Sequence, residues 1–393
     1  MPHASTKGAV TTAPFLCFVF AVLAVGASPA SANGFFNQFI DSEDGWFDGS
    51  DWFIENAYGF LPVPIFITEP AVGEGIGLAG VFIHADKDEP LRDESGNFTR
   101  PSISAVAGAV TNNDSWFVGG GHLGVWKDDH IRYLGLGGYA SVNLKFFGTA
   151  GGEIDEGLGR GLEFNGEGLF IDQNIRFRLG ESDWFLGPQY QFLDIKNKFD
   201  LGLDIPGLEL PEFDVQTSGL GLIAEFDTLD TNFTPNRGVF AQLDFFAFDE
   251  GIGSDFDYQV YTGKFRTFFG LAETLVLGLR FDGQIANGDI PFFAVPFIDL
   301  RGIPVLRYQG ETVFTAETEA RWDFHPRFSA IGFVGAGRAA VDFDEISDAP
   351  SRVSKGLGFR YLVARKLSLR AGIDVAWGPE DTVWYLSIGQ TWR

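Results

Sequence analysis

The chain has 393 residues and a formal net charge of −25, with 53 Asp and Glu against 28 Lys and Arg. A surface this acidic excludes nucleic acid as a partner, because like charges repel. The 51 Gly, 42 Phe and 9 Trp disfavour helices and favour strands. Cys17 is the only cysteine of the sequence, so neither a disulfide framework nor a thiol nucleophile is expected.

The first 32 residues are predicted to be a secretory signal peptide. Lys7 supplies the positive start, the apolar run Phe15–Ala27 follows, and the tripeptide ASA at 30–32 has the small residues of a cleavage site. A membrane anchor is the alternative, but the run is shorter than the ~18 residues that a spanning helix needs. The chain is therefore expected to be exported with cleavage of this segment.

Residues 33–72 are predicted to be a periplasmic lead segment, too short for a domain. Their first part, NGFFNQFIDSEDGWFDGSDWFIENAYGF, is acidic and aromatic and fits a short amphipathic helix. The stretch LPVPIFITEP then contains Pro62, Pro64 and Pro70, which disfavour regular structure. The folded body of the chain is accordingly expected to extend from 73 to 393.

Alternation of apolar and polar residues dominates the rest of the chain. In TVFTAETEARWDF (312–324) one face ends in Trp322 and Phe324, and the other face carries four charged side chains. A period of two marks a strand. The segments reach the ~9–11 residues of a strand that crosses a bilayer, whereas the strands of a soluble sandwich, the alternative, are usually ~5–6 residues long. The predicted fold is all-β, a transmembrane antiparallel up-and-down β-barrel.

Fifteen segments show this pattern: 73–84, 103–113, 115–126, 130–147, 164–179, 183–195, 215–228, 238–249, 255–269, 273–287, 312–325, 327–341, 353–365, 367–378 and 381–392. Because single-chain bacterial barrels have even strand counts, sixteen strands are predicted, with the missing one between 129 and 164. Short connections such as 325–327 are assigned to the periplasmic side, and the long 288–311 to the outside. Seven charged residues are expected to face the lumen: Arg280, Asp282, Glu317, Glu319, Arg321, Asp323 and Arg338.

Motifs of catalysis or of cofactor binding lack the context that they require. GxGxxG occurs at 75–80 and 119–124, but inside alternating segments with no helix after them, so a nucleotide site is not expected. The histidines lack zinc-ligand spacing, and the sequence contains no GxSxG elbow. The chain is therefore expected not to be an enzyme and to need no cofactor or metal.

Three stretches, DLRGIPVLRYQGETVFTAETEARW (299–322), FDTLDTNFTPNRGVF (226–240) and WYLSIGQTWR (384–393), carry a family resemblance. They resemble the BamA/TamA superfamily of outer-membrane assembly and two-partner secretion barrels, the bacterial surface antigen family, in its short form without POTRA domains. The resemblance implies an integral protein of a Gram-negative outer membrane, in contact with the lipid of that membrane.

In that family the connection before the strand at 312–325 dips into the lumen, and its Arg-Gly motif contacts acidic residues of the inner wall. The resemblance implies that the loop motif of this chain comprises Arg301, Gly302, Ile303, Arg307 and Tyr308. Ile303 replaces the usual aromatic residue, and Gly335 in FVGAG replaces the usual inner-wall Asp. The partners are therefore expected on the strand that follows the loop, at Glu317, Glu319 and Arg321.

The C-terminal strand resembles that of the family as well. Trp384, Leu386, Ile388 and Trp392 are expected to alternate outward, with Gly389 between them, as a signal for the barrel-assembly machinery of the cell. The implied function is membrane insertion or translocation of a client protein or lipid, through a weakly paired seam between the first and last strands. A passive or loop-gated pore for small solutes is the alternative.

Overall fold

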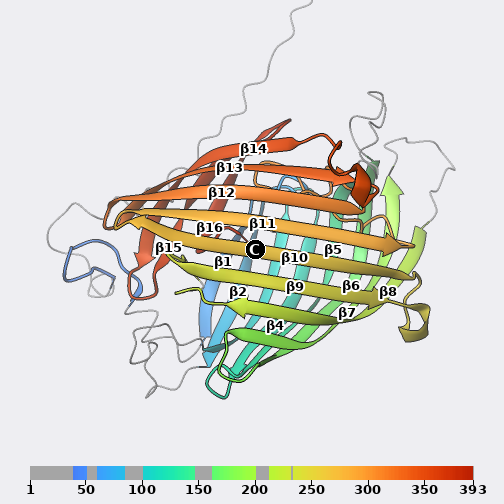
Figure 1. Ribbon diagram of the computed structural model, residues 1–393, viewed down its shortest axis with the longest axis horizontal. Coiled ribbons are helices and arrows are strands. Elements are labelled where there is room, and N and C mark those ends of the chain that lie inside the picture. The colour runs from blue at the N-terminus through green and yellow to red at the C-terminus, as the bar shows by residue number, and fades with distance from the viewer. Residues whose placement is uncertain are drawn as a thin grey trace, which may run out of the picture.

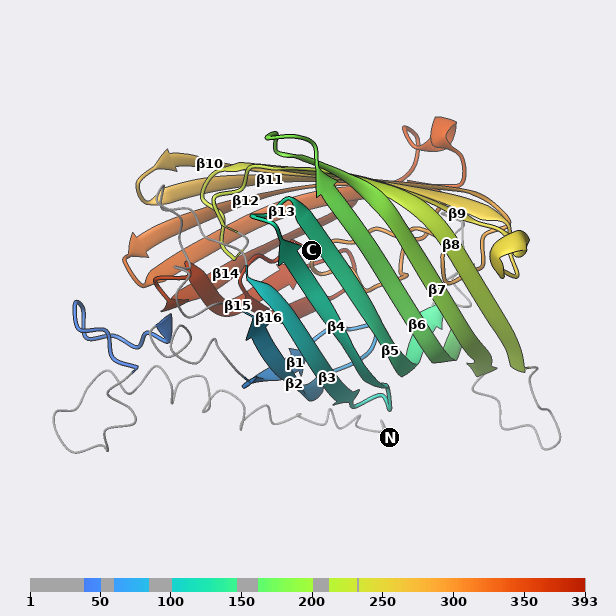
Figure 2. The ribbon, with the colours of Figure 1, turned by 90° about the horizontal axis from the view of Figure 1, so that it is seen from below.

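Sixteen strands form one antiparallel sheet in which each strand pairs with its neighbours in the chain. The computed structural model describes residues 39–50, 60–84, 101–146, 162–200, 212–231 and 233–392, so the predicted signal peptide lies outside the described residues. The sheet curls until β1 and β2 lie beside β15 and β16, which makes a nearly closed barrel (Figures 1 and 2). The all-β antiparallel barrel of sixteen strands that the sequence predicts is confirmed.

The strands are β1 (Phe60–Ile67), β2 (Gly75–His84), β3 (Ser102–Thr111), β4 (Trp116–Trp126), β5 (Ile131–Phe146), β6 (Leu162–Arg178), β7 (Trp184–Asp200), β8 (Glu212–Asp227), β9 (Gly238–Phe248), β10 (Tyr258–Ala272), β11 (Leu275–Gly288), β12 (Thr312–His325), β13 (Phe328–Ala340), β14 (Arg352–Ala364), β15 (Leu369–Trp377) and β16 (Thr382–Ile388). In the described residues, two 3-10 helices, η3 (Glu250–Ile252) and η4 (Phe343–Glu345), lie in connections. No helix in the described part of the chain is long and apolar enough to cross a membrane.

β1 is the strand that the sequence prediction missed. Its Pro62 and Pro64 pair with Gly80 and Leu78 of β2. Proline lacks an amide hydrogen, so it fits an edge strand whose outer side forms no ladder. The lead segment predicted for 33–72 is therefore wrong from residue 60 onward. The extra strand expected between 129 and 164 is also wrong for the residues described there, because they belong to β5 and β6.

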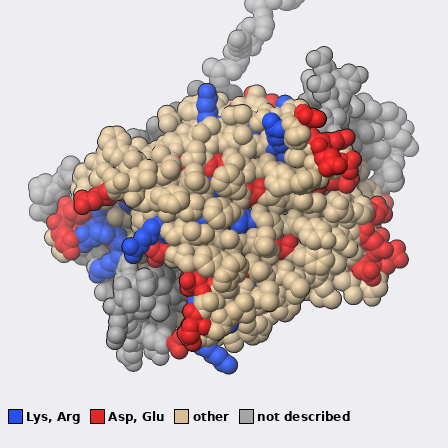
Figure 3. All heavy atoms as spheres, in the orientation of Figure 1, with Lys and Arg blue, Asp and Glu red and all other residues tan. Residues whose placement is uncertain are grey.

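The barrel wall is apolar on the outside. Leu222, Leu243, Phe281 and Leu357 lie on four different strands and are each more than half exposed on the outer face. In the space-filling view the charged side chains gather at the two ends of the strands, and the middle of the wall is mostly uncharged (Figure 3). This is the arrangement of a wall whose middle band faces acyl chains.

Arg338 is an exception among the charged residues predicted to face the lumen. It pairs with Phe314, which is exposed on the outer face, so Arg338 points outward too. Its guanidinium donates hydrogen bonds to the carbonyl oxygens of Ile346 and Ser347. The lumen assignment is wrong because β13 has small residues on both of its faces. Its sequence therefore does not show which face is inside.

Residues 39–50 include a small hairpin that is docked under the end of the barrel that carries the short turns. Arg327, in the turn between β12 and β13, has a fully buried side chain. It lies 2.5 Å from a carboxylate oxygen of each of Asp41, Asp44 and Asp48. An isolated β-bridge closes the hairpin, so residues 39–49 do not form the amphipathic helix that the sequence suggested.

Candidate functional site

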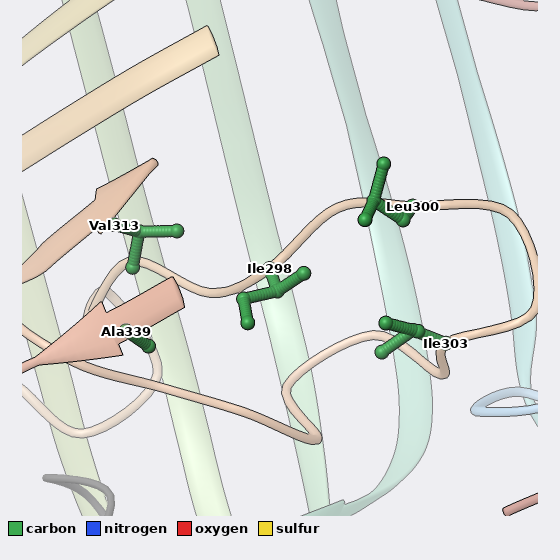
Figure 4. Packing of buried hydrophobic residues seen from close by; sticks show 5 residues of the cluster. All are labelled: Ile298, Leu300, Ile303, Val313 and Ala339. Carbon is green, nitrogen blue, oxygen red and sulfur yellow. The ribbon is translucent and has the colours of Figure 1, made fainter. Parts of the chain in front are cut away.

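The long connection from β11 to β12 folds back into the barrel. Its residues Ile298, Leu300 and Ile303 are buried, and they form a cluster with Val313 of β12 and Ala339 of β13 (Figure 4). Burial of these aliphatic side chains holds the loop against the inner wall, at roughly 1.5–3 kcal/mol for each fully buried side chain.

Glycines of β13 give the loop room against that wall. A Cβ atom on Gly337 would lie 2.5 Å from Cγ2 of Ile298, and one on Gly335 would lie 2.9 Å from Cδ2 of Leu300. Gly335 occupies the position where the family that this sequence resembles has an aspartate. In this chain an aliphatic side chain of the loop therefore fills the place beside the wall, and the carboxylates that hold the loop must come from elsewhere.

Arg301 reaches three carboxylates of the inner wall. Its Nε donates to Oε1 of Glu317 at 3.0 Å, and its Nη2 lies 2.7 Å from Oε2 of Glu319. Its Nη1 donates to Oδ2 of Asp374 at 3.1 Å, and its Cζ lies 3.5 Å from the ring centroid of Phe333. The Arg301 side chain is only 10% exposed, and a charge so buried needs such partners. The structure thus brings together Arg301 and the two glutamates named from the sequence, and it adds an aspartate.

Arg321, the third residue expected near Arg301, lies elsewhere. Its guanidinium donates to the carbonyl oxygen of Pro235 at 3.3 Å and to the side-chain oxygen of Asn236. Both acceptors belong to the turn between β8 and β9. The expected contact with the loop is wrong because Arg321 lies closer to the end of β12 that carries the short turns, beyond the reach of the loop.

Asp374 of β15 is the carboxylate that the sequence analysis missed. It is fully buried, and besides Arg301 it accepts hydrogen bonds from Arg360 at 2.6 and 2.8 Å and from Oγ of Ser387 at 3.2 Å. Two guanidinium groups therefore share one carboxylate. The signal that could have revealed it is that β15 carries a single acidic residue, at an inward position.

Gly302 bends the chain beside Arg301. Its φ of +87° is a conformation that favours glycine, and a Cβ atom there would lie 3.0 Å from the backbone nitrogen of Gly378. The Gly302 amide donates to Oη of Tyr385 on β16 at 2.8 Å. Ile303 packs in the aliphatic cluster, so a branched side chain serves where the family usually has a ring.

The outgoing part of the loop contacts both flanks of the gap between β16 and β1. Arg307 donates to Oε2 of Glu380 at 2.7 Å, and Oη of Tyr308 donates to Oε1 of Glu380 at 2.6 Å. Burial and then this hydrogen bond raise the pKa of Tyr308 to about 12, so its hydroxyl stays protonated. The amide of Val305 donates to Oε1 of Glu69 at 3.3 Å. Glu380 lies between β15 and β16, and Glu69 lies between β1 and β2, so the loop joins the last hairpin to the first.

β1 and β16 do not pair with each other along their described residues. β1 has 8 residues and β16 has 7, whereas β6 and β7 have 17 each. Because a strand rises ~3.3 Å per residue, the wall at this seam is about half as tall as the wall at β6 and β7. The seam, defined as the β1 and β16 edges, is thus both unpaired and low.

The C-terminal segment leaves the wall at Gly389. Of the residues predicted to face outward, Trp384, Leu386 and Ile388 of β16 do so. Gly389 then has a φ of +73°, and Trp392 lies inside the barrel, 4% exposed, with its ring 5.4 Å from that of Phe268. The outward placement predicted for Trp392 is wrong because the strand ends at Ile388, and alternation cannot continue through the turn.

Among known proteins, the chain has matches in solved structures. No family model and no curated protein matches the sequence. Among solved structures, the chain is similar to BamA from Haemophilus ducreyi lacking POTRA domains 1-3, with a TM-score of 0.55 and 11% identity, over 92% of this chain and 82% of that chain. The fold is that of a BamA-like barrel.

Two CdiB structures are also similar. CdiB from Acinetobacter baumannii has a TM-score of 0.52 and 11% identity, over 84% of this chain and 59% of that chain. CdiB from Escherichia coli has a TM-score of 0.52 and 12% identity, over 83% of this chain and 61% of that chain. The BamA-like barrel thus spans less than two thirds of either CdiB chain, and at these identities the likeness concerns the fold.

Proposed function

We propose that this protein is an outer-membrane barrel that passes a client protein or lipid into or across the membrane through the seam between β1 and β16. The observation that carries the proposal is the seam itself, which consists of two short edge strands that do not pair. The likeness to the BamA and CdiB barrels supports a role of this general kind and a place in the outer membrane.

The two edges of the seam differ in what they offer to a client. Pro62 and Pro64 remove amide donors from β1, so β16 has no complete ladder to form with it. β16 contains no proline and presents a full row of donors and acceptors on its free side. An unpaired edge is a template for an added strand. A client strand is therefore expected to pair first with β16.

The low wall at the seam also affects the surrounding lipid. A tilted strand needs ~9–11 residues to cross the hydrocarbon region, and β1 and β16 have 8 and 7. A bilayer meets a short hydrophobic surface by thinning locally. Thinner lipid beside the seam lowers the barrier for a client that enters from the lumen.

The loop supports a seam route more than a passive pore. Its buried residues occupy the lumen along β12 and β13, where a solute would pass. Its contacts with Glu69 and Glu380 bridge the outer end of the seam. A loop in this place holds the first and last hairpins together until a client displaces it.

A reversible tether across the seam tests the proposal. In a Cys17→Ser background, Phe66→Cys and Thr382→Cys place one thiol on each edge, and a reducible crosslinker joins them. The protein is reconstituted in liposomes, and the rate at which an unfolded small outer-membrane barrel folds into them is measured. We expect acceleration over empty liposomes, its loss on crosslinking and its return on reduction.

The matched control is Phe66→Cys with Ile76→Cys, which are register partners on β1 and β2. Crosslinking this pair leaves the seam free, so the acceleration is expected to persist. Equal rates with the seam tethered and free contradict the seam route. A large, stable single-channel conductance of the unmodified protein in planar bilayers favours the solute pore instead.

A further inference from the structure

A cavity of about 430 Å³ lies in the lumen, away from the loop. Strands β4–β6 and β8–β10 form most of it, and the C-terminal segment covers one side. The residues that matter for its chemistry are Arg132, Arg176, Arg266, Gln242, Phe240 and Phe268. Its volume is within the ordinary range of small-molecule sites, ~300–1,000 Å³.

Two of the three arginines are already neutralised by the wall. Arg132 lies 2.5 Å from Glu225 and 3.0 Å from Asp227, and it stacks 3.8 Å from the ring centroid of Phe185. Arg176 forms an ion pair with the second oxygen of Glu225. These groups make a closed network in which each carboxylate has a cation.

Arg266 has no such partner. It is 8% exposed, and its Nε and Nη2 are buried without a hydrogen-bond acceptor among the described residues. No carboxylate of the described chain comes within ion-pair distance of it; Asp282, the acid on the neighbouring strand, has its Oδ2 2.6 Å from Arg280. Its guanidinium lies over a ring, that of Phe240, at 5.6 Å from the centroid.

A buried guanidinium without a counter-charge is costly, by several kcal/mol. The carboxylates that line the cavity are two, Glu225 and Asp227, against three arginines. The lining itself therefore has one positive charge more than negative charges, and Asp129, outside the lining, also pairs with Arg132 at 2.6 Å. A buried guanidinium of this kind is compatible with a stable barrel when a bound anion supplies the missing negative charge.

We propose that this cavity binds a small organic oxyanion, a carboxylate or a phosphate monoester, with Arg266 as the group that recognises its charge. A guanidinium matches both kinds of oxyanion through paired N–H donors. Phe240 and Phe268 provide rings for an apolar or aromatic part of the same molecule. The site is separate from the loop and meets the seam at Ile388 of β16, and it does not depend on the function proposed for the seam.

Binding to the purified barrel in detergent tests the site by isothermal titration. The probes are phenyl phosphate, benzoate, inorganic phosphate and the uncharged benzyl alcohol. We expect saturable binding of at least one aromatic anion, tighter than that of inorganic phosphate, and none of benzyl alcohol. Which of the two aromatic anions binds more tightly identifies the oxyanion.

Arg266→Gln is expected to weaken that binding at least tenfold. The matched control is Arg237→Gln, which removes the same charge from an exposed position in the nearby turn, outside the cavity, and is expected to bind like the unmodified protein. Saturable binding of neither anion, or equal affinity in Arg266→Gln, overturns the proposal.

Thermal unfolding separates loss of the binding site from misfolding of Arg266→Gln. Without anion, Arg266→Gln is expected to unfold at the same temperature as the unmodified barrel or higher, because it removes an unpaired buried charge. The anion that binds should raise the unfolding temperature of the unmodified protein and leave that of Arg266→Gln unchanged. A variant that is less stable without anion shows that Arg266 is a structural residue, and contradicts the site.

Discussion

Nη1 of Arg301 lies 3.1 Å from Oδ2 of Asp374, although 73 positions separate the two residues in the chain. The contact ties the inward loop to β15, the strand next to the seam. Asp374 also binds Ser387 on β16, at 3.2 Å from the hydroxyl oxygen. The position of the loop and the position of the last strand are thus linked through one buried carboxylate.

Asp374→Asn is predicted to destabilise the barrel. The change leaves Arg301 and Arg360 buried with one negative charge fewer between them, and breaking a buried ion pair from one side costs about 3–5 kcal/mol. The midpoint of heat-induced unfolding, followed by mobility on gels, should fall well below that of the unmodified protein. Asp348→Asn, on the exposed connection after η4, is the matched control and should leave the midpoint unchanged. An unchanged midpoint for Asp374→Asn would show that Glu317 and Glu319 suffice.

Gly302→Ala is predicted to displace the loop. The new methyl group would lie 3.0–3.1 Å from Gly378, Ala376 and Ser354, at a φ of +87°. Backbone strain at such a position costs about 1–3 kcal/mol, and the steric contact adds to it. Single-channel recordings should show larger and more frequent openings than the unmodified barrel.

Gly180→Ala is the control for Gly302→Ala. It has a φ of +61°, but its new methyl group would have no atom within 4 Å. It therefore reproduces the backbone strain without the collision and without any contact with the loop. Equal conductance of Gly302→Ala and Gly180→Ala would mean that the loop tolerates the methyl group.

The strands could be predicted from sequence because their apolar and polar faces differ. β12 alternates over its whole length, since one face meets lipid and the other meets water and charge. β1 was missed because Pro62 and Pro64 count against a strand unless its edge is known to be free, and that depends on the whole barrel. Arg338 was assigned to the wrong face because β13 has small residues on both faces.

The site was predictable only where its parts are close in the chain. Glu317 and Glu319 follow Arg301 by fewer than twenty positions, on the strand that continues the loop. Asp374 and Tyr385 reach the same motif because the sheet curls round and places β15 and β16 beside the loop. That closure brings residues together across the lumen, and strand periodicity contains no information about it.

The docking of residues 39–50 is predicted to depend on pH. The hydrogen bond from Arg327 lowers the pKa of Asp44. For Asp48, burial acts to raise the pKa, but hydrogen bonds from Ser50 and Arg327 outweigh it and lower it. Carboxylates with lowered pKa stabilise the docked state fully above their ordinary pKa, about 4, and lose that contribution as the pH falls through the lowered values.

A spin label at position 42 measures this docking, with Ser42→Cys in the Cys17→Ser background. Its spectrum should show a restricted label at pH 7 and a mobile one as the pH falls below about 4. The double change Asp44→Asn and Asp48→Asn should give the mobile spectrum already at pH 7, and Glu43→Gln, whose exposed carboxylate pairs with Arg365, should not. A spectrum that stays restricted at pH 3 would contradict ionic docking.

Trp392→Ala is predicted to release the C-terminal segment from the lumen. Trp392 is 4% exposed and packs on Phe268 and Val276, and Gly278 leaves space for its ring, since a Cβ atom there would lie 2.7 Å from Cη2. Removing a buried Trp costs about 3–5 kcal/mol, most of it from the docking of this segment. Carboxypeptidase should therefore shorten Trp392→Ala faster than the unmodified protein.

Release of the C-terminal segment should affect the seam, because Gly389 follows directly after the last residue of β16. Loss of the anchor should let β16 move from the wall, and under the proposed function the liposome assay should then run faster without crosslinking. Trp377→Ala is the matched control, since that ring is 40% exposed on the outer face of β15 and holds no segment in the lumen. All variants are refolded from urea into detergent, which separates this effect from recognition by the assembly machinery. Resistance to carboxypeptidase in Trp392→Ala would show that the turn at Gly389 alone holds the segment inside.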